Sequence, residues 1–532
     1  MMNAAVAQQQ ETTDSAAIAQ IRNEGMNNSQ AMETLSYLTD VYGPRLTGST
    51  GLVKAEEWAK DKLASWGLQK AHLEAWGPFG KGWTLEKYSA NVISRQNFPL
   101  LSYPRAWSPG TNGNAKGDII YLDAKTDSAL NTFKGKLKGA FVLIGDTREL
   151  EAHWDPEATR EADSSLLKLA NAGVPIPRQR RGPQNAAGQN ARAILDYEKI
   201  KLCEKEGALA LLSISPAGDG GNMQFVQQAR VPAHPDTPFV KRISAYDKNA
   251  PKILPQIYVN AEHFNRLVRM IQKGEKPKLE MNLDVKFNPA DSCYNVIAEI
   301  PGTDLADEVV MIGAHVDSWH AATGATDNGT GSTVCMEAMR ILKTLNLKPR
   351  RTIRIALWSG EEQGEFGSSA YVKEHFGEQE AATTPGGQRG PVKLKPEADK
   401  FSVYFNDDNG TGKFRGIYME GNEAARPIFR KWFEPFAGWG ASTLTLASTG
   451  STDHEPFKAI GLPGFQFIQD GIEYFTRSWH SSNDFYDRVL PEDMKQSAVM
   501  MATLAYNAAM RDEKFPRKPL PQPQSTGAPG SH

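Results

Sequence analysis

The sequence is poor in cysteine, with only Cys203, Cys293 and Cys335 among 532 residues. Three scattered cysteines, an odd number, indicate neither a disulfide framework nor a zinc site made of thiolates. A metal ion in this protein would therefore have to be held by histidine and carboxylate side chains.

Net charge, long apolar runs and nucleotide-binding motifs are also missing. The formal net charge is -2 and the pI is near 6.6, which gives no support for a nucleic-acid partner or an acidic membrane surface. No run of about 18 apolar residues occurs, so the sequence predicts no membrane span. Neither GxGxxG after a predicted strand nor GxxxxGK[ST] is present, so nucleotide binding has no support.

The length predicts two or more domains with sizeable cores. Residues 1–14 contain an Ala-Val-Ala pattern typical of signal cleavage sites, although no hydrophobic stretch precedes it. A trimmed precursor predicts a periplasmic or secreted protein, and a simple disordered polar terminus is the open alternative. Residues 516–532 are rich in Pro, Gly and Ser, which predicts a second flexible end.

The pattern of predicted secondary structure changes twice along the chain. Residues 14–80 are predicted to be helical, with Ser49 or Thr50 capping one helix that Gly67 ends. From 89 to 286, short β-like runs such as GDIIYL, GAFVLIG, ALALLSI and PQIYV alternate with polar loops, and no paired His/Asp/Glu pattern is found. The basic stretch PRQRRGPQ in this region is interpreted as a solvated loop.

The most informative stretch is VVMIGAHVDSWHAATGATDNGTG, which begins at Val309. Its apolar start predicts a buried parallel strand that ends in His315 and Asp317, and Asp327 precedes a helix predicted from Thr330 to about Leu345. Open α/β sheets place their chemistry at such strand ends, and zinc takes nitrogen and oxygen ligands of this kind. Taken alone, the motif fits a metal site and a hydrogen-bonded strand end about equally well.

Alternating strands and helices from about residue 295 to 512 predict an α/β fold, a mostly parallel mixed sheet flanked by helices. Strands are predicted at 309–314, 352–359, 401–406, 416–420 and 464–468. Four of these strands end in acidic residues or histidines: His315, Asp317 and Asp327; Glu361 and Glu362; Asp407 and Asp408; His480 and Asp484.

Carboxylates gathered at one sheet edge repel one another unless a cation neutralises them. Two metal ions about 3.5–4 Å apart need two histidines, a bridging carboxylate, further carboxylates and a free general base. The sequence supplies that number of groups. A serine hydrolase built on Asp453 and His454 has little support, because no GxSxG motif occurs.

Four segments carry a family resemblance: GAHVDSWHAATGATDNGTG, RRTIRIALWSGEEQGEFGSSAY, YFNDDNG and WHSSNDFYD. They resemble the co-catalytic di-zinc exopeptidases, a family that includes bacterial secreted aminopeptidases and plasma glutamate carboxypeptidase. The resemblance implies a discontinuous catalytic domain (15–88 and 287–515). It also implies an insert (89–286) similar to a protease-associated domain, with flexible termini at 1–14 and 516–532.

The resemblance also implies a ligand set for two Zn²⁺ ions per chain. One ion would be held by His315 and Asp408, the other by Glu362 and His480, and Asp327 would bridge them. Asp408 is chosen over its neighbour Asp407 because the family pattern Asn-x-Asp matches Asn406-Asp407-Asp408. His320 is surplus to this set. The peptide after Asp327 is expected to be cis, as in the family.

Roles beyond ligation follow from the same resemblance. Glu361 would be the catalytic general base, Asp317 would orient His315 through its second ring nitrogen, and Asp484 would do the same for His480. The chain departs from the family in two places. A polar insertion occupies 378–400, and Trp479 stands where relatives often carry tyrosine, so the oxyanion-stabilising group stays open, with Tyr474 the nearest phenol.

The expected function is a zinc-dependent exopeptidase acting on short peptides through a metal-bridged water activated by Glu361, as an aminopeptidase or dipeptidase. A glutamate carboxypeptidase-like enzyme is the main alternative, followed by a glutaminyl cyclase and a non-enzymatic binding protein. The expected partner is a peptide substrate, with no nucleic acid and no membrane span, and a homodimer is left open.

Overall fold

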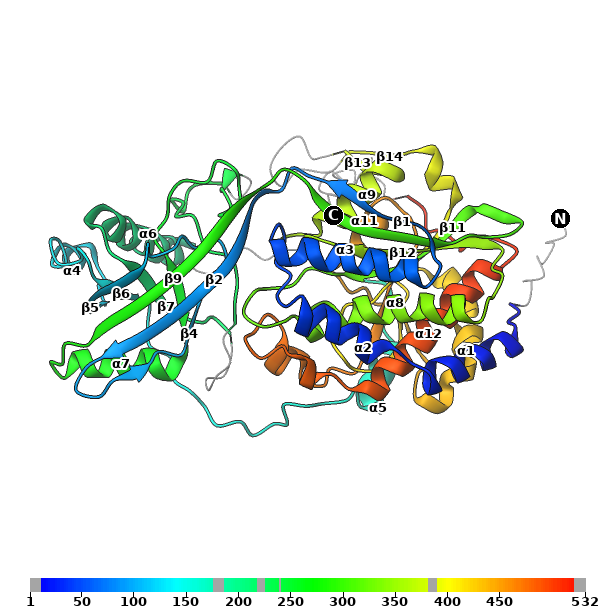
Figure 1. Cartoon of the computed structure of the whole chain (residues 1–532), viewed down its shortest axis with the longest axis horizontal. Coiled ribbons are helices and arrows are strands. Elements are labelled where there is room, and N and C mark those ends of the chain that lie inside the picture. Colours follow the sequence, from blue (N-terminus) through cyan, green and yellow to red (C-terminus); the bar gives the residue numbers. More distant parts are fainter. Residues whose placement is uncertain (1–10, 176–185, 218–224, 239–240, 381–389, 521–532) are drawn as a thin grey trace, which may run out of the picture.

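The computed structural model describes residues 11–175, 186–217, 225–238, 241–380 and 390–520. They form two eight-stranded sheets, set side by side along the long axis of the molecule in Figure 1. The Ala-Val-Ala pattern at 5–7 and the basic stretch at 177–184 lie outside the described residues.

The first sheet contains the predicted α/β strands. In spatial order it consists of β1 (Gln69–Trp76), β10 (Cys293–Ile300), β12 (Arg351–Trp358), β11 (Leu305–His315), β15 (Phe401–Asn406), β18 (Gly464–Gln469), β16 (Phe414–Tyr418) and β17 (Thr443–Thr445). The four central strands β12, β11, β15 and β18 are mutually parallel. Their carboxyl ends therefore meet at one edge, which we call the C-terminal edge.

Both faces of this sheet are covered. Alternate residues of β11 enter different cores: Val310 and Ile312 one, Val309 and Met311 the other. The first core is covered by α1 (Ser15–Asn27), α2 (Ala31–Ser36), α3 (Thr50–Ser65), α8 (Thr330–Thr344), α10 (Arg426–Phe433) and α12 (Pro491–Met510). The second is covered by α9 (Phe366–His375) and α11 (Glu455–Ala459). The predicted fold class is confirmed.

The N-terminal region follows the prediction in part. Helix α3 begins after Ser49, whose hydroxyl accepts a hydrogen bond from the Leu52 amide at 3.2 Å, as expected for an N-cap. The helical prediction is wrong beyond it, because residues 69–76 form β1, an edge strand paired antiparallel with β10. Pairing with a distant strand overrides local propensity there.

In the sequence, all strands of the second sheet lie between β1 and β10. We call residues 80–290 the insert. Its order is β3 (Phe98–Pro99), β2 (Gly80–Ile93), β9 (Lys278–Ala290), β5 (Asn114–Leu122), β6 (Phe141–Ile144), β7 (Ala210–Ile214), β8 (Gln256–Val259) and β4 (Ser102–Pro104). Helices α4 (Asp127–Asn131), α6 (Ala186–Glu206) and α7 (Ala261–Gln272) belong to it as well. The four predicted β-like runs correspond to β5, β6, β7 and β8.

The insert is joined to the first sheet in two places. One is the long ribbon formed by β2 and β9, and the other is the segment between β6 and α5, which we call the crossing segment. Strands β2 and β9 pair antiparallel along their lengths, from Gly80 opposite Ala290 to Ile93 opposite Lys278. The chain also leaves the second sheet and runs along the bottom of Figure 1 to α5 (Asp163–Ala170), which packs near β17. The domain limits and the protease-associated character of the insert stay predictions.

Two smaller features complete the fold. The described parts of the polar insertion include β13 (Gly377–Gln379) paired with β14 (Val392–Leu394). None of the helices in the described part of the chain combines the length and the apolar character needed to cross a bilayer.

One buried ion-pair network tests this packing. The Arg340 guanidinium on α8 donates to Glu337 at 2.8 Å and to Glu24 of α1 at 2.7 Å, and its side chain is 4% exposed. Replacing Arg340 with Met leaves buried carboxylates unpaired, so we expect a loss of about 3–5 kcal/mol in the free energy of unfolding. Denaturant melting measures it.

The matched control is Arg426→Met, which removes a surface pair with Glu423 and should change stability by less than about 1 kcal/mol. Equal losses in the two variants would contradict the assignment of the Arg340 network as a buried support.

Candidate active site

The C-terminal edge brings together five of the predicted side chains in two groups that share one residue. His315, Asp327 and Asp408 form the first group, and Asp327, Glu362 and His480 form the second. Within each group the potential ligand atoms lie within 4.8 Å of one another. Four adjacent parallel strands deliver these residues, which is why segments far apart in sequence converge here.

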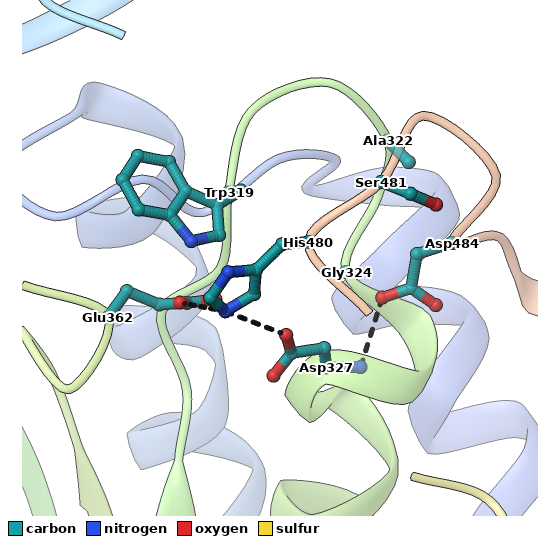
Figure 2. A pocket seen from close by; sticks show the side chains of 8 residues that line it. All are labelled: Trp319, Ala322, Gly324, Asp327, Glu362, His480, Ser481 and Asp484. Atoms are coloured by element: carbon teal, nitrogen blue, oxygen red, sulfur yellow. Dashed lines mark hydrogen bonds and ion pairs between the residues drawn. The ribbon is translucent and has the colours of Figure 1, made fainter. Parts of the chain in front are cut away.

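Asp327 lies between the two histidines. Its Oδ1 is 3.4 Å from His315 Nε2, and its Oδ2 is 3.5 Å from His480 Nε2. Asp408 Oδ1 completes the first group at 3.3 Å from His315 Nε2, and Glu362 Oε2 completes the second at 2.9 Å from His480 Nε2. Figure 2 shows Glu362, His480 and Asp327 converging in this way. The Asp327–Asn328 peptide is cis, as expected.

Glu361 stands beside the two groups without belonging to either. Its Oε2 is 3.8 Å from His315 Nε2, and its side chain is 11% exposed. Burial raises the pKa of both Glu361 and Glu362 well above the ordinary range, and the charge of Asp327 raises that of Glu362 further. The chain alone therefore does not satisfy the negative charge that it gathers here.

Unpartnered buried atoms test whether this donor set suits metal ions. Asp327 Oδ2 and Glu362 Oε1 are both buried and accept no hydrogen bond within the described residues. Buried polar groups normally have partners, and imidazole nitrogens with carboxylate oxygens are the donors that zinc takes. The residues present fit two zinc ions that share Asp327.

The structure separates the two neighbouring aspartates after β15. Asp408 enters the first group, whereas the buried Asp407 lies outside both groups, and its backbone carbonyl accepts a hydrogen bond from Asn328 at 2.8 Å. Burial raises the pKa of the Asp407 carboxyl well above its ordinary value. Of these two aspartates, Asp408 alone lies in a group that could hold a metal ion, and its role as a ligand stays a prediction.

Asp317 has a different contact pattern from the one expected. His315 Nδ1 is 3.0 Å from the backbone carbonyl of Asp317 and 3.7 Å from its carboxylate. The carboxylate instead accepts hydrogen bonds from Thr47 Oγ1 at 2.9 Å and from the amides of Glu361 and Glu362, each at 3.3 Å. Its side chain thus positions the adjacent glutamates, and its backbone orients the histidine.

Asp484 also acts on a different residue from the one expected. Its carboxylate accepts hydrogen bonds from the amides of Thr326 at 2.7 Å and Asp327 at 3.0 Å, the latter drawn in Figure 2. Sequence proximity suggested His480, but the loop folds back so that Asp484 faces the turn that carries Asp327. Burial raises the pKa of Asp484 to about 7.

Arg45 is a site residue that the sequence did not reveal. Its side chain is fully buried and donates only to backbone carbonyls, including those of Val316 at 2.6 Å, Thr323 at 2.7 Å and Gly324 at 2.9 Å. These carbonyls belong to the loop between His315 and Asp327. Burial lowers the Arg45 pKa to about 10, against the opposing effect of the site's carboxylates. A lone arginine in a loop carries no sequence signal of this role.

A cavity of about 180 Å³ opens beside the second group. Its lining residues, all labelled in Figure 2, are Trp319, Ala322, Gly324, Asp327, Glu362, His480, Ser481 and Asp484. Trp479 stacks on the His480 ring with centroids 4.0 Å apart. The Tyr474 hydroxyl hydrogen-bonds to the Asp327 carboxylate, and burial, followed by the charge of Asp327, raises the pKa of this phenol.

Two other histidines lie outside the site. His320 is buried against Trp83, and its Nε2 lies 2.7 Å from the Pro104 carbonyl oxygen. His454 is fully buried, and its Nε2 lies 3.5 Å from Glu420. Asp453 accepts a hydrogen bond from Ser368 at 2.5 Å, which does not support a serine triad built on Asp453 and His454.

Sequence comparisons with known proteins point to a peptidase family. Residues 295–505 match the model of Peptidase family M28. Over these residues the chain belongs to peptidase family M28. It is 26% identical over 501 residues to carboxypeptidase Q of Mus musculus, covering 94% of this chain and 90% of that protein. Aminopeptidase YwaD of Bacillus subtilis is 24% identical over 396 residues, covering 71% and 80%.

Solved structures show the same fold. A peptidase M28 precursor from Shewanella amazonensis has a TM-score of 0.64 at 23% identity, over 95% of this chain and 98% of that one. BSAP, a zinc aminopeptidase from Bacillus subtilis, has a TM-score of 0.52 at 19% identity, over 91% and 95%.

Residues 295–505 therefore carry an M28 metallo-exopeptidase domain of the co-catalytic zinc class, and the predicted family and enzyme class are confirmed. M28 peptidases typically bind two zinc ions, and the two groups described above are candidate sites for them.

Asp484 offers a direct test of the support beneath Asp327. Replacing Asp484 with Ala leaves the Thr326 and Asp327 amides without their acceptor, so the Asp327 carboxylate loses its orientation. We expect about a 10–100-fold loss in zinc affinity, as for other outer partners of metal ligands, measured by competition with a chromogenic chelator. The control is Asp487→Ala, because Asp487 is exposed and should leave the affinity unchanged. Equal affinities in both variants would contradict this role.

Proposed function

We propose that this protein is a two-zinc exopeptidase in which His315 and Asp408 hold one ion, Glu362 and His480 hold the other, and Asp327 bridges them. The observation that carries the proposal is the placement of Asp327, with one carboxylate oxygen facing each histidine. A carboxylate in that position is what a pair of metal ions requires between them.

The protein's own groups perform the proton transfers. Bound zinc would polarise the scissile carbonyl and make the attacking water more acidic. Glu361, which is outside both ligand groups but 3.8 Å from His315, takes the proton of that water and then delivers it to the leaving amine. Asp317 holds the amides of Glu361 and Glu362, so the base and the neighbouring ligand keep a fixed separation.

The lining of the cavity supports action on short peptides with a free N-terminus. None of its eight lining residues is lysine or arginine, so the lining offers no cation to hold the terminal carboxylate of a substrate. An aminopeptidase or dipeptidase fits this lining.

Carboxypeptidase activity is the second candidate, and the relatives favour it. Carboxypeptidase Q of Mus musculus aligns with 94% of this chain, more than the 71% matched by the aminopeptidase of Bacillus subtilis. Such an enzyme would need a cation to hold the substrate's terminal carboxylate.

Glu361 tests the mechanism. Glu361→Gln keeps the size of the side chain but cannot accept the water's proton, so we expect turnover to fall by about 10²–10⁴-fold while zinc stoichiometry stays at two. Peptide hydrolysis and metal analysis of the same sample measure both. Glu374→Gln, at an exposed position, is the matched control. Activity retained by the Glu361 variant would contradict the mechanism.

A peptide library distinguishes the two candidate specificities. We expect zinc-loaded protein to remove N-terminal residues from free peptides and to leave N-acetylated peptides intact, because the cavity lining offers no cation that would hold a terminal carboxylate. Mass spectrometry of the digests, with chelator-treated protein as the control, gives the result. Trimming of the acetylated set from its C-terminus would instead establish the carboxypeptidase.

A further inference from the structure

The loop that carries His480 has an unfavourable backbone conformation at two positions. This segment, residues 470–484, follows β18, and we call it the His480 loop. Ile472 has a φ of 45° and His480 a φ of 50°, values that non-glycine residues rarely adopt and that are least favourable for a β-branched side chain. Such conformations persist only where the surrounding structure holds them.

The first contact that holds the loop comes from the crossing segment of the insert. Thr159 and Ile472 exchange two backbone hydrogen bonds, of 3.0 and 2.7 Å. The adjacent Arg160 donates to Asp470 and to Asp493, each at 2.7 Å. The Asp470 side chain is fully buried and that of Arg160 is 46% exposed, and this ion pair joins the insert to the start of the His480 loop.

Neighbouring residues of the same segment extend this contact. The Thr476 hydroxyl donates to the Glu157 carbonyl at 2.8 Å, and the Glu157 carboxylate pairs with Arg477. Residues 157–161 therefore contact the His480 loop at its start and at its middle. We call them the first clamp.

The second contact comes from another part of the insert and reaches the proposed ligand itself. The Val226 amide donates to the His480 carbonyl at 2.7 Å, and Phe225 pairs with Ser481. The buried Phe225 ring lies 5.6 Å from the rings of both Trp479 and His480. We call Phe225 and Val226 the second clamp.

Each clamp bonds to the backbone at a strained position, the first at Ile472 and the second at His480. We propose that the two clamps hold the His480 loop in its metal-binding conformation, so that the insert is a structural part of the active site. Arg160 and Phe225 are then positioning residues that act through His480. The zinc part of this inference rests on the proposed role of His480 as a ligand, and the loop part does not.

Hydrogen exchange of the metal-free protein tests the loop part. The variants are Arg160→Gln, Phe225→Ala and the double substitution, and mass spectrometry follows the amides of residues 470–484. We expect exchange in this loop to become at least about tenfold faster in each single variant, since the strained backbone loses a support, and faster still in the double variant.

Matched substitutions in the same insert serve as controls. Arg192→Gln removes an exposed pair with Asp146, and Phe98→Ala removes a ring that packs on Arg266 and His263. Both should leave exchange in the His480 loop at the wild-type rate. Unchanged exchange in Arg160→Gln and Phe225→Ala would overturn the proposal, as would equal acceleration in the two controls.

Zinc release tests the consequence for the metal site. In a chelator chase we expect one of the two ions to leave about 10–100-fold faster from the clamp variants and the other to leave at the wild-type rate. Faster loop exchange with both ions released at wild-type rates would overturn the link between the clamps and the metal. A lack of peptidase activity in the wild type would count against the proposed function alone, because the exchange experiment uses metal-free protein.

Discussion

Carboxylates buried close together at the C-terminal edge repel one another, and the surrounding structure is arranged around that repulsion. Asp327, Glu361, Glu362 and Asp408 all lie within reach of one histidine or the other. Arg45 supplies a permanent positive charge beneath them, and backbone amides are directed at the outer carboxylates Asp317 and Asp484. The remaining negative charge calls for cations, which is the physical basis of the metal requirement.

Much of the first sheet and of the proposed ligand set could be predicted from the sequence, for a definite reason. Buried parallel strands are continuous apolar runs in the sequence, and the functional residues of open α/β sheets lie just after the carboxyl ends of those strands. His315, Glu362 and Asp408 lie at or just after the ends of three such runs. Their place in the sequence therefore predicts that all three lie at the C-terminal edge of the sheet. Edge strand β1 lacks such a run, and its pairing with β10 could not be read locally.

The residues that hold the proposed ligands in place could not be predicted from the sequence, because their contacts depend on the tertiary arrangement of the loops. Asp484 is four residues from His480 in sequence but hydrogen bonds to the turn at Asp327. Arg45 reaches a loop more than 270 residues away. Thr159 and Val226 contact the His480 loop from two separate parts of the insert. Such contacts appear only when the two sheets are placed together, and they connect the insert to the chemistry of the first sheet.

The central claim is that Asp327 bridges two metal ions, and anomalous X-ray scattering at the zinc edge tests it most directly. Crystals of the zinc-loaded protein should show two strong peaks about 3.5–4 Å apart, one near His315 and Asp408 and one near His480 and Glu362, with Asp327 between them. A single peak, or two peaks that Asp327 does not join, would contradict the account.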